Sequence, residues 1–168
     1  GVLDLVVNDN QGSGYYLKKK DGSWQPFTPF HAFPTNLNDP AIEMAGLSNN
    51  GKTDAILIDQ SSVTLYPSLG TNGYAPLIAA KKQADFPLVK QDFQKEYVGF
   101  ADMAGDGLSH RVKIANGVVE YWPDMGYGVF GKKVSCGNAP WFGEDFDSMR
   151  LLLADVDGSG TTDLVYAH

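Results

Sequence analysis

The sequence contains a single cysteine, Cys136. One thiol excludes an intrachain disulfide framework and a CxxC metal site. The sequence also lacks an uncharged apolar run of the roughly 18 to 20 residues that a membrane-spanning helix needs, and its opening GVLDLVVNDNQG lacks the basic start and long apolar stretch of a signal peptide. We therefore expect no membrane-spanning segment and a fold held together by side-chain packing and strand pairing.

Basic residues are few. Thirteen lysines and arginines stand against twenty aspartates and glutamates, which gives a net charge of −7. Such a chain repels polyanions, so nucleic acid is not an expected partner. Motifs such as GxSxG and HExxH are missing, and the histidines His31, His110 and His168 are scattered. We accordingly predict that the chain is not an enzyme.

Glycine is abundant, with 19 residues beside 9 prolines, while 43% of the chain is apolar. Many tight turns between short strands with large side chains account for this composition. The prediction is an all-β fold.

An internal repeat of about fifty residues organises the chain. The segment LLLADVDGSGTTDLVYA consists of an apolar run, an acidic glycine-rich turn and a second apolar run, and this arrangement recurs in EYVGFADMAGDGLSHRVKIA and EMAGLSNNGKTDAILI. Numbering each turn from its first residue, position nine is Asp54, His110 or Asp163, and LDLVV places Asp4 at the same point of the first unit. These four residues are 50, 56 and 53 residues apart.

A second motif follows each turn at a similar offset, in VTLYPSLGTNGYAPL and VVEYWPDMGYGVFGKK. Alternating residues in both motifs predict half-buried strands, and each unit then holds about four strands. We predict about three four-stranded blades of a β-propeller, because blades packed around an axis bury both sheet faces. The predicted units are residues 1–40, 41–95, 96–148 and, in part, 149–168. A stacked open sheet or a compact barrel remains an alternative, and we expect the chain to be a segment of a longer polypeptide. Residues 79–94 lack these signals and are expected to form a surface excursion.

The last acidic turn is a candidate calcium site. Calcium takes six to eight oxygen ligands, and a short turn supplies them by placing oxygen-bearing groups at alternate positions. The candidate ligands are Asp155, Asp157, Ser159, the Thr161 carbonyl and Asp163. Position twelve is Tyr166 instead of the glutamate of an EF-hand, and the flanks favour strands over helices. We expect a bound Ca²⁺ to be structural; the alternative is a metal-free turn whose carboxylates accept hydrogen bonds from backbone amides.

The motifs ADVDGSGTTDLVY and EYWPDMGYGVFG resemble the repeat region of the B subunit of bacterial insecticidal toxin complexes and of SpvB-type virulence proteins, and more widely FG-GAP/VCBS repeats. The resemblance implies a propeller region of a secreted or extracellular bacterial toxin subunit. Its partners would be other toxin-complex subunits or neighbouring blades of the same chain. No enzymatic part is implied, so the expected function is non-enzymatic docking and scaffolding.

Two other functions compete with this one. Trp24, Trp122 and Trp141 could stack on sugars in a carbohydrate-binding propeller, although tryptophans also fill the space between blades. A hydrolase that uses an acidic turn as a catalytic metal site is the weakest alternative, because a filled structural calcium site activates no nucleophile.

Overall fold

The structure, a computed structural model, describes residues 4–9, 12–34, 39, 41–60, 62–80, 85–88 and 95–167. The described part is all-β, as predicted; it has two single-turn 3₁₀ helices, at Gly70–Asn72 and Ser148–Arg150, and no α-helix. No helix in it is long and apolar enough to cross a membrane.

Among the described residues, four antiparallel sheets follow one another in chain order. The first contains β1 (Leu5–Asp9), β2 (Gly12–Tyr16) and β3 (Thr28–Pro29), and the second contains β4 (Ile42–Ala45), β5 (Asp54–Ile58), β6 (Val63–Tyr66) and β7 (Ile78–Ala80). The third contains β8 (Tyr97–Ala101), β9 (His110–Ala115), β10 (Val118–Trp122) and β11 (Val134–Ser135), and the fourth contains β12 (Leu151–Ala154) and β13 (Asp163–Tyr166).

The two complete sheets repeat one design. Each strand pairs with the next strand in sequence, so each sheet is a four-stranded meander. The acidic turn joins the first strand of a sheet to the second, with Ala45 opposite Asp54 and Ala101 opposite His110. This is the blade-like fold that the repeat predicts. The division into units at the stated boundaries stays a prediction.

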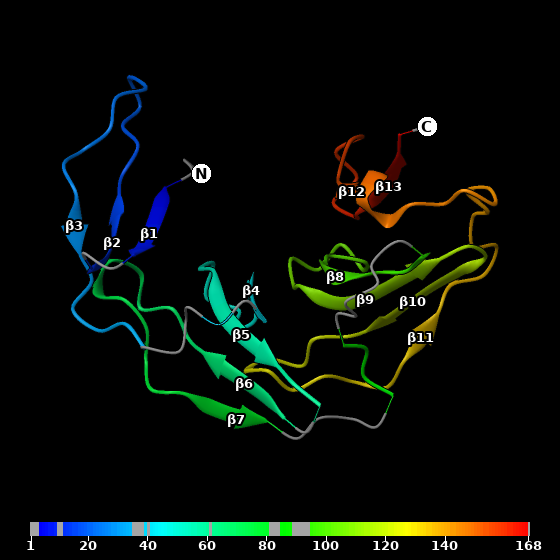
Figure 1. The fold of residues 1–168 in the computed structure, drawn as a ribbon, viewed down its shortest axis with the longest axis horizontal. Coiled ribbons are helices and arrows are strands. Elements are labelled where there is room, and N and C mark those ends of the chain that lie inside the picture. Colours follow the sequence, from blue (N-terminus) through cyan, green and yellow to red (C-terminus); the bar gives the residue numbers. More distant parts are fainter. Residues whose placement is uncertain are drawn as a thin grey trace.

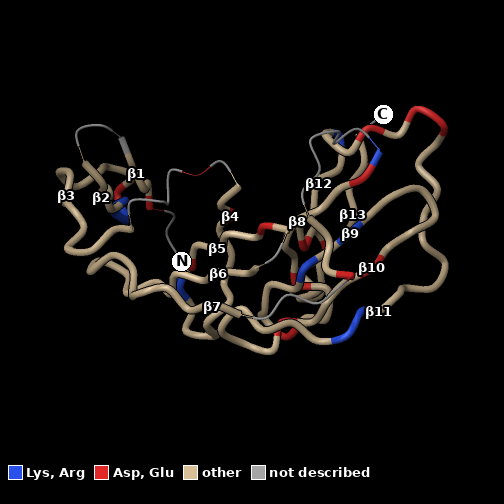
Figure 2. The backbone as a smooth tube through the Cα atoms, turned by 60° about the horizontal axis from the view of Figure 1, so that its bottom comes forward, with Lys and Arg blue, Asp and Glu red and all other residues tan. Residues whose placement is uncertain are grey.

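The sheets are arranged along an open arc (Figure 1). The β1–β3 sheet lies at one end of the arc and the β12–β13 sheet at the other, with the two complete blades between them. Acidic segments are spread over several sheets (Figure 2). The four sheets meet their neighbours at three interfaces, which we number in chain order.

The hydrophobic core lies in these interfaces. At the second interface, apolar residues of β4–β6 pack against Trp122 and Phe130 of the next blade. At the third, Val112 and Ile114 of β9 share a cluster with Leu151 of β12. The first interface is aromatic, since the Phe30 ring lies 6.1 Å from that of Tyr74. Because each sheet buries its faces against its neighbours, its stability depends on them.

The interpretation of residues 79–94 as a surface excursion is wrong for Phe86. Its side chain is buried in the second interface, where its ring lies 4.7 Å from Phe130 and 6.1 Å from Trp122. Burial of its aromatic ring lowers the free energy of folding, although the sequence around Phe86 carries no strand or turn signal. Residues 81–84 and 89–94 of the predicted excursion lie outside the described part.

Candidate functional site

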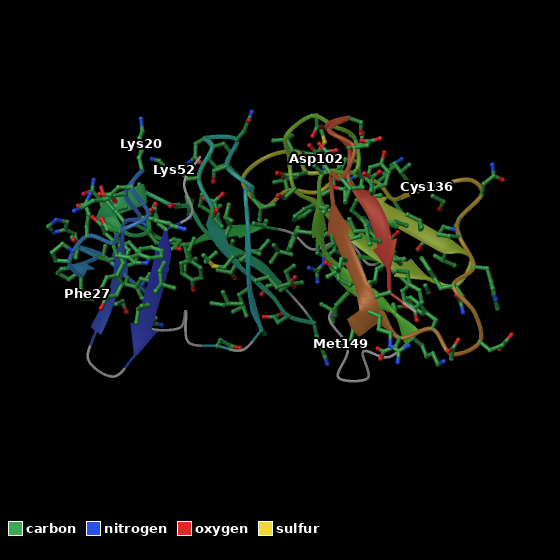
Figure 3. The ribbon with its side chains drawn as sticks, turned by 90° about the horizontal axis from the view of Figure 1, so that it is seen from above. Lys20, Phe27, Lys52, Asp102, Cys136 and Met149 are labelled. Atoms are coloured by element: carbon green, nitrogen blue, oxygen red, sulfur yellow. The ribbon has the colours of Figure 1, made fainter. Side chains whose placement is uncertain are left out.

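The acidic turns gather on one side of the arc. Figure 3 shows Lys52 and Asp102, which belong to the turns of neighbouring blades, near the same edge of the molecule. Hydrogen bonds join consecutive turns: the Gly46 amide donates to Ser109 Oγ at 3.3 Å, and the Thr162 amide donates to the Asp102 carbonyl at 2.9 Å. Position one of one turn thus contacts position eight of the next in both cases.

Position nine of the first three units accepts a hydrogen bond from a backbone amide fourteen residues later. In the two complete blades this amide lies within the second motif, two residues after the third strand, so the bond ties the second strand to the end of the third. The donor–acceptor distances are 3.2 Å for Lys18 N to Asp4 Oδ1, 2.7 Å for Ser68 N to Asp54 Oδ1 and 3.1 Å for Asp124 N to His110 Nδ1.

The aspartates at position nine accept a second bond, from the amide at position two of their own turn. Leu47 N donates to Asp54 Oδ2 and Val156 N to Asp163 Oδ2, both at 2.9 Å. Asp54 is fully buried, so both amides depend on its carboxylate for a partner. The position-nine side chain therefore links its own turn to the following hairpin. We call the hydrogen bonds that it accepts from these two amides the clasp.

His110 replaces the carboxylate in the third unit. Its Nδ1 accepts the Asp124 amide, so in the neutral ring the proton lies on Nε2, which is 3.6 Å from Asp106 Oδ1. A protonated Nε2 has no lone pair for a metal. The oxygen and nitrogen atoms of Asp102, Asp106 and His110 lie within 4.8 Å of one another, yet this tautomer disfavours metal binding there.

The Asp102 carboxylate accepts hydrogen bonds from backbone amides of its own turn. Its carboxylate accepts four backbone amides, from Ala104, Gly105, Asp106 and Gly107, at 2.7 to 3.3 Å. Partial burial raises the pKa of Asp102, but the four amides outweigh it and hold the pKa below its usual value. The 102–110 turn thus has the geometry of the metal-free alternative.

The 155–163 turn is more open. Carboxylate oxygens of Asp155, Asp157 and Asp163 lie within 4.8 Å of one another, so the structure brings the three predicted carboxylates together. Ser159 Oγ lies 2.9 Å from Thr161 Oγ1. Asp155 accepts the Gly160 amide at 3.0 Å. Bonds from the Ser159 hydroxyl and amide lower the pKa of Asp157, which keeps it ionised. This exposed oxygen-donor set fits a Ca²⁺ ion.

Asp124 is a buried carboxyl group near the clasp of the third unit. Burial raises its pKa to about 6; the Gly126 amide, 2.8 Å from Oδ1, opposes the rise, and the Asp54 and Asp106 carboxylates add to it. Among the described residues its Oδ2 has no hydrogen-bond partner.

Sequence reasoning missed an ion pair across the second interface. Arg111 is fully buried, and its Nη1 donates to both Glu43 oxygens, at 2.7 and 2.8 Å. Its guanidinium carbon lies 4.7 Å from the centre of the Phe100 ring. An arginine within a predicted strand was the available signal, but its partner lies 68 residues away.

The tryptophans do not form a repeated set of pockets. Trp122 is only 1% exposed and donates its indole N–H to Asp85 Oδ1 at 3.3 Å, so it cannot stack on a sugar. Trp24 and Trp141 are exposed, but they occupy unrelated positions of the repeat. Cys136 is exposed.

No family model and no curated protein matches the chain. Solved structures do match. A structure described as the Photorhabdus luminescens Tc holotoxin pore, with the mutation TccC3-D651A, is 33% identical with a TM-score of 0.86, over 99% of this chain and 8% of the matched chain. Two structures, of TcdB2-TccC3-Cdc42 and of TcdB2-TccC3 without its hypervariable C-terminal region, share the fold at 20% and 21% identity, with TM-scores of 0.53 and 0.51; each covers 100% of this chain and 10% of the other.

The chain therefore spans about a tenth or less of the proteins it matches. The likeness to the holotoxin pore extends over nearly all of its residues, both blades and both end sheets included. The predicted resemblance to toxin-complex proteins is confirmed, whereas that to SpvB-type proteins and FG-GAP/VCBS repeats stays a prediction: the chain is a blade-like propeller segment similar to part of the Tc holotoxin pore.

Proposed function

We propose that the chain is a non-enzymatic scaffold and docking segment of a secreted bacterial toxin-complex protein. The observation that carries the proposal is the match to the Tc holotoxin pore over 99% of the chain. Its structural role within a toxin complex follows from that match; docking, secretion and partners among other toxin-complex subunits are the parts that we propose.

The two end sheets support a docking role. Val165 of β13 is equivalent to Val112 of β9, which is fully buried at the third interface, yet Val165 is 37% exposed. Trp24 is equivalent to Tyr74 and Phe130, which are both buried, yet it is exposed. Each end sheet thus has apolar positions of the kind that the middle blades bury against a neighbour, and in the proposed scaffold a further blade, of the same longer chain or of another subunit, packs there.

A segment exchange tests this function. The matching segment of the Photorhabdus Tc protein is replaced by this chain, and holotoxin formation is followed by electron microscopy. We expect assembly to persist and to fall when the exchanged segment carries Val165→Asp. Val129→Asp, at an exposed turn residue, is the matched control and should not affect assembly. If Val165→Asp and its control assemble equally well, the end sheet is no docking surface.

We also propose that the 155–163 turn binds a structural Ca²⁺ ion, supported by the grouping of its three carboxylates. The ion would neutralise their mutual repulsion and brace the β12–β13 hairpin. Calorimetric titration of the chelator-treated chain should show about one equivalent bound and a higher melting temperature. Asp157→Asn should abolish both effects, whereas Asp106→Asn in the neighbouring turn should leave both unchanged. Equal loss in both variants, or no binding to the unaltered chain, would disprove the site.

A further inference from the structure

The clasp of the third unit is built on an imidazole ring, whereas that of the second unit is built on a carboxylate. Asp54 accepts the Ser68 amide at 2.7 Å, and in the equivalent place His110 accepts the Asp124 amide at 3.1 Å. The two acceptors are 0% and 1% exposed. Both belong to complete four-stranded sheets, so the two clasps can be compared directly.

The two kinds of acceptor respond differently to acid. A carboxylate remains an ionised acceptor down to about pH 4. An imidazole ring, in contrast, takes up a proton in the range of about pH 5 to 8, and it then carries hydrogen on both nitrogens. Nδ1 of a protonated His110 would turn a hydrogen of its own toward the hydrogen of the Asp124 amide. The bond between them cannot persist in that form.

Acceptors for a protonated ring lie next to both of its nitrogens. Nε2 of His110 is 3.6 Å from Asp106 Oδ1 and has no hydrogen-bond partner among the described residues. Asp124, whose amide contacts Nδ1, has a buried carboxylate oxygen, Oδ2, that also lacks a partner in the described part of the chain. The protonated ring can donate from Nε2 to Asp106 and from Nδ1 to the Asp124 carboxylate. The same groups therefore support two arrangements, one with the amide bond and one without it.

The groups around the imidazole ring are an aromatic side chain and several carboxylates. Asp102 and Asp106 belong to the same turn as the ring, and one oxygen of each lies within 4.8 Å of a ring nitrogen. Burial raises the pKa of Asp124 to about 6, and the charges of Asp54 on β5 and of Asp106 add to the rise. On β10, the Tyr121 ring stacks on the imidazole with 5.4 Å between the ring centres. A positive charge on the ring would thus be surrounded by acidic groups.

The turn that this clasp holds has a strained backbone. Gly126, Tyr127 and Gly128 are all in the left-handed region, with φ of 90°, 53° and 76°. For a tyrosine this conformation is unfavourable, because its Cβ approaches the following carbonyl oxygen. The Tyr127 amide donates to the Leu47 carbonyl of the preceding blade at 2.9 Å. The clasp and this bond together hold a strained turn against the second interface.

We infer that His110 makes the clasp of the third unit a pH-sensitive latch, whose protonation releases the turn of residues 124–130 from β9 and from the neighbouring blade. One proton enters from solvent at Nδ1, and no bond between heavy atoms changes. The contribution of this clasp is present at neutral pH and is lost as the pH falls. The second unit, with a carboxylate in the same place, stays closed over the same range.

Hydrogen exchange of backbone amides tests the latch within one molecule. The turn of residues 124–130 is compared with its equivalent, residues 68–74, at about pH 7.5 and about pH 5, after correction for the intrinsic exchange rates. Protection of residues 124–130 should fall in acid by about tenfold or more relative to residues 68–74. Nitrogen NMR of the His110 ring should show hydrogen on Nε2 alone at neutral pH and on both nitrogens in acid.

Two variants assign the response to the imidazole. Asparagine has the shape of the aspartate at position nine of the other units and does not titrate, so His110→Asn should keep the turn protected at both pH values. Asp124→Asn retains the imidazole, so its turn should still open in acid. Near-ultraviolet circular dichroism at neutral pH checks that both variants fold. If His110→Asn does not fold, the double variant His110→Asp with Asp124→Ser replaces it, because it copies the Asp54–Ser68 pair of the second unit.

Four results would overturn the inference. The first is unchanged protection of residues 124–130 in acid, and the second is an equal loss in residues 68–74, which would mark a general loosening of the fold. The third is an acid response of His110→Asn, or of the double variant, that matches that of the unaltered chain. The fourth is hydrogen on Nδ1 of His110 at neutral pH, because the ring would then not accept the Asp124 amide.

Discussion

Replacing Asp54 with alanine should strongly destabilise the chain. The side chain is fully buried and accepts the amides of Leu47 and Ser68, at 2.9 and 2.7 Å. Alanine leaves both amides without this acceptor. A buried unsatisfied amide costs about 1 to 3 kcal/mol, so the loss in unfolding free energy should be about 4 kcal/mol. That is a large part of the 5 to 15 kcal/mol that typically stabilises a domain.

The assay is urea unfolding followed by tryptophan fluorescence in the presence of a chelator. Trp122 is buried and the other two tryptophans are exposed, so the signal reports chiefly on the second interface. Asp163→Ala is the matched control: this carboxylate is only half-buried and accepts the Val156 amide, so its loss should cost about 1 kcal/mol or less. If the two variants lose equal stability, the clasp does not depend on burial and the reasoning fails.

Two further predictions concern buried charges. Glu43→Gln should lower the unfolding free energy by about 3 kcal/mol, because it leaves Arg111 charged, buried and without a carboxylate. Adding Arg111→Met should restore most of this stability, measured by urea unfolding. If the double variant shows no recovery, the unpaired arginine is not the cause of the loss. For Asp124, the folded pKa near 6 lies above the unfolded value, so its favourable contribution is full below about pH 4 and is lost as the pH rises through 6. Asp124→Asn should flatten the fall in melting temperature between about pH 4 and pH 6, and an unchanged profile would contradict this assignment.

The blade-like fold was predictable because its signals are local and periodic. Alternating apolar residues, glycine-rich turns and a recurrence near fifty residues each act over a few positions, and the repetition confirms them jointly. The Arg111–Glu43 pair and the burial of Phe86 were not predictable from such signals. Both depend on which faces of two different blades meet, and a repeat length alone does not determine that.

Of the position-nine residues only Asp163 was predicted as a metal ligand, which stays a prediction; the structure shows Asp4, Asp54, His110 and Asp163 as hydrogen-bond acceptors. The two interpretations are hard to separate in sequence, because calcium and backbone amides both favour carboxylate oxygens. His110 was the distinguishing signal. An imidazole nitrogen can accept an amide hydrogen, but calcium takes oxygen ligands, so a histidine at this position retains the clasp and loses the calcium ligand.

The histidine at position 110 distinguishes a feature common to the units, the position-nine hydrogen bond, from a feature of one turn, the carboxylate cluster. A position-nine acceptor bonds to the amide fourteen residues later in every unit where that amide is described, whether the acceptor is an aspartate or a histidine. The three-carboxylate cluster, in contrast, belongs to the 155–163 turn, where Asp163 Oδ2 accepts the Val156 amide and a carboxylate has a second oxygen to offer an ion. Clasp and ion are therefore compatible in one carboxylate. A bound Ca²⁺ would strengthen a hairpin that the clasp already holds, so calcium removal should lower the melting temperature without unfolding the chain.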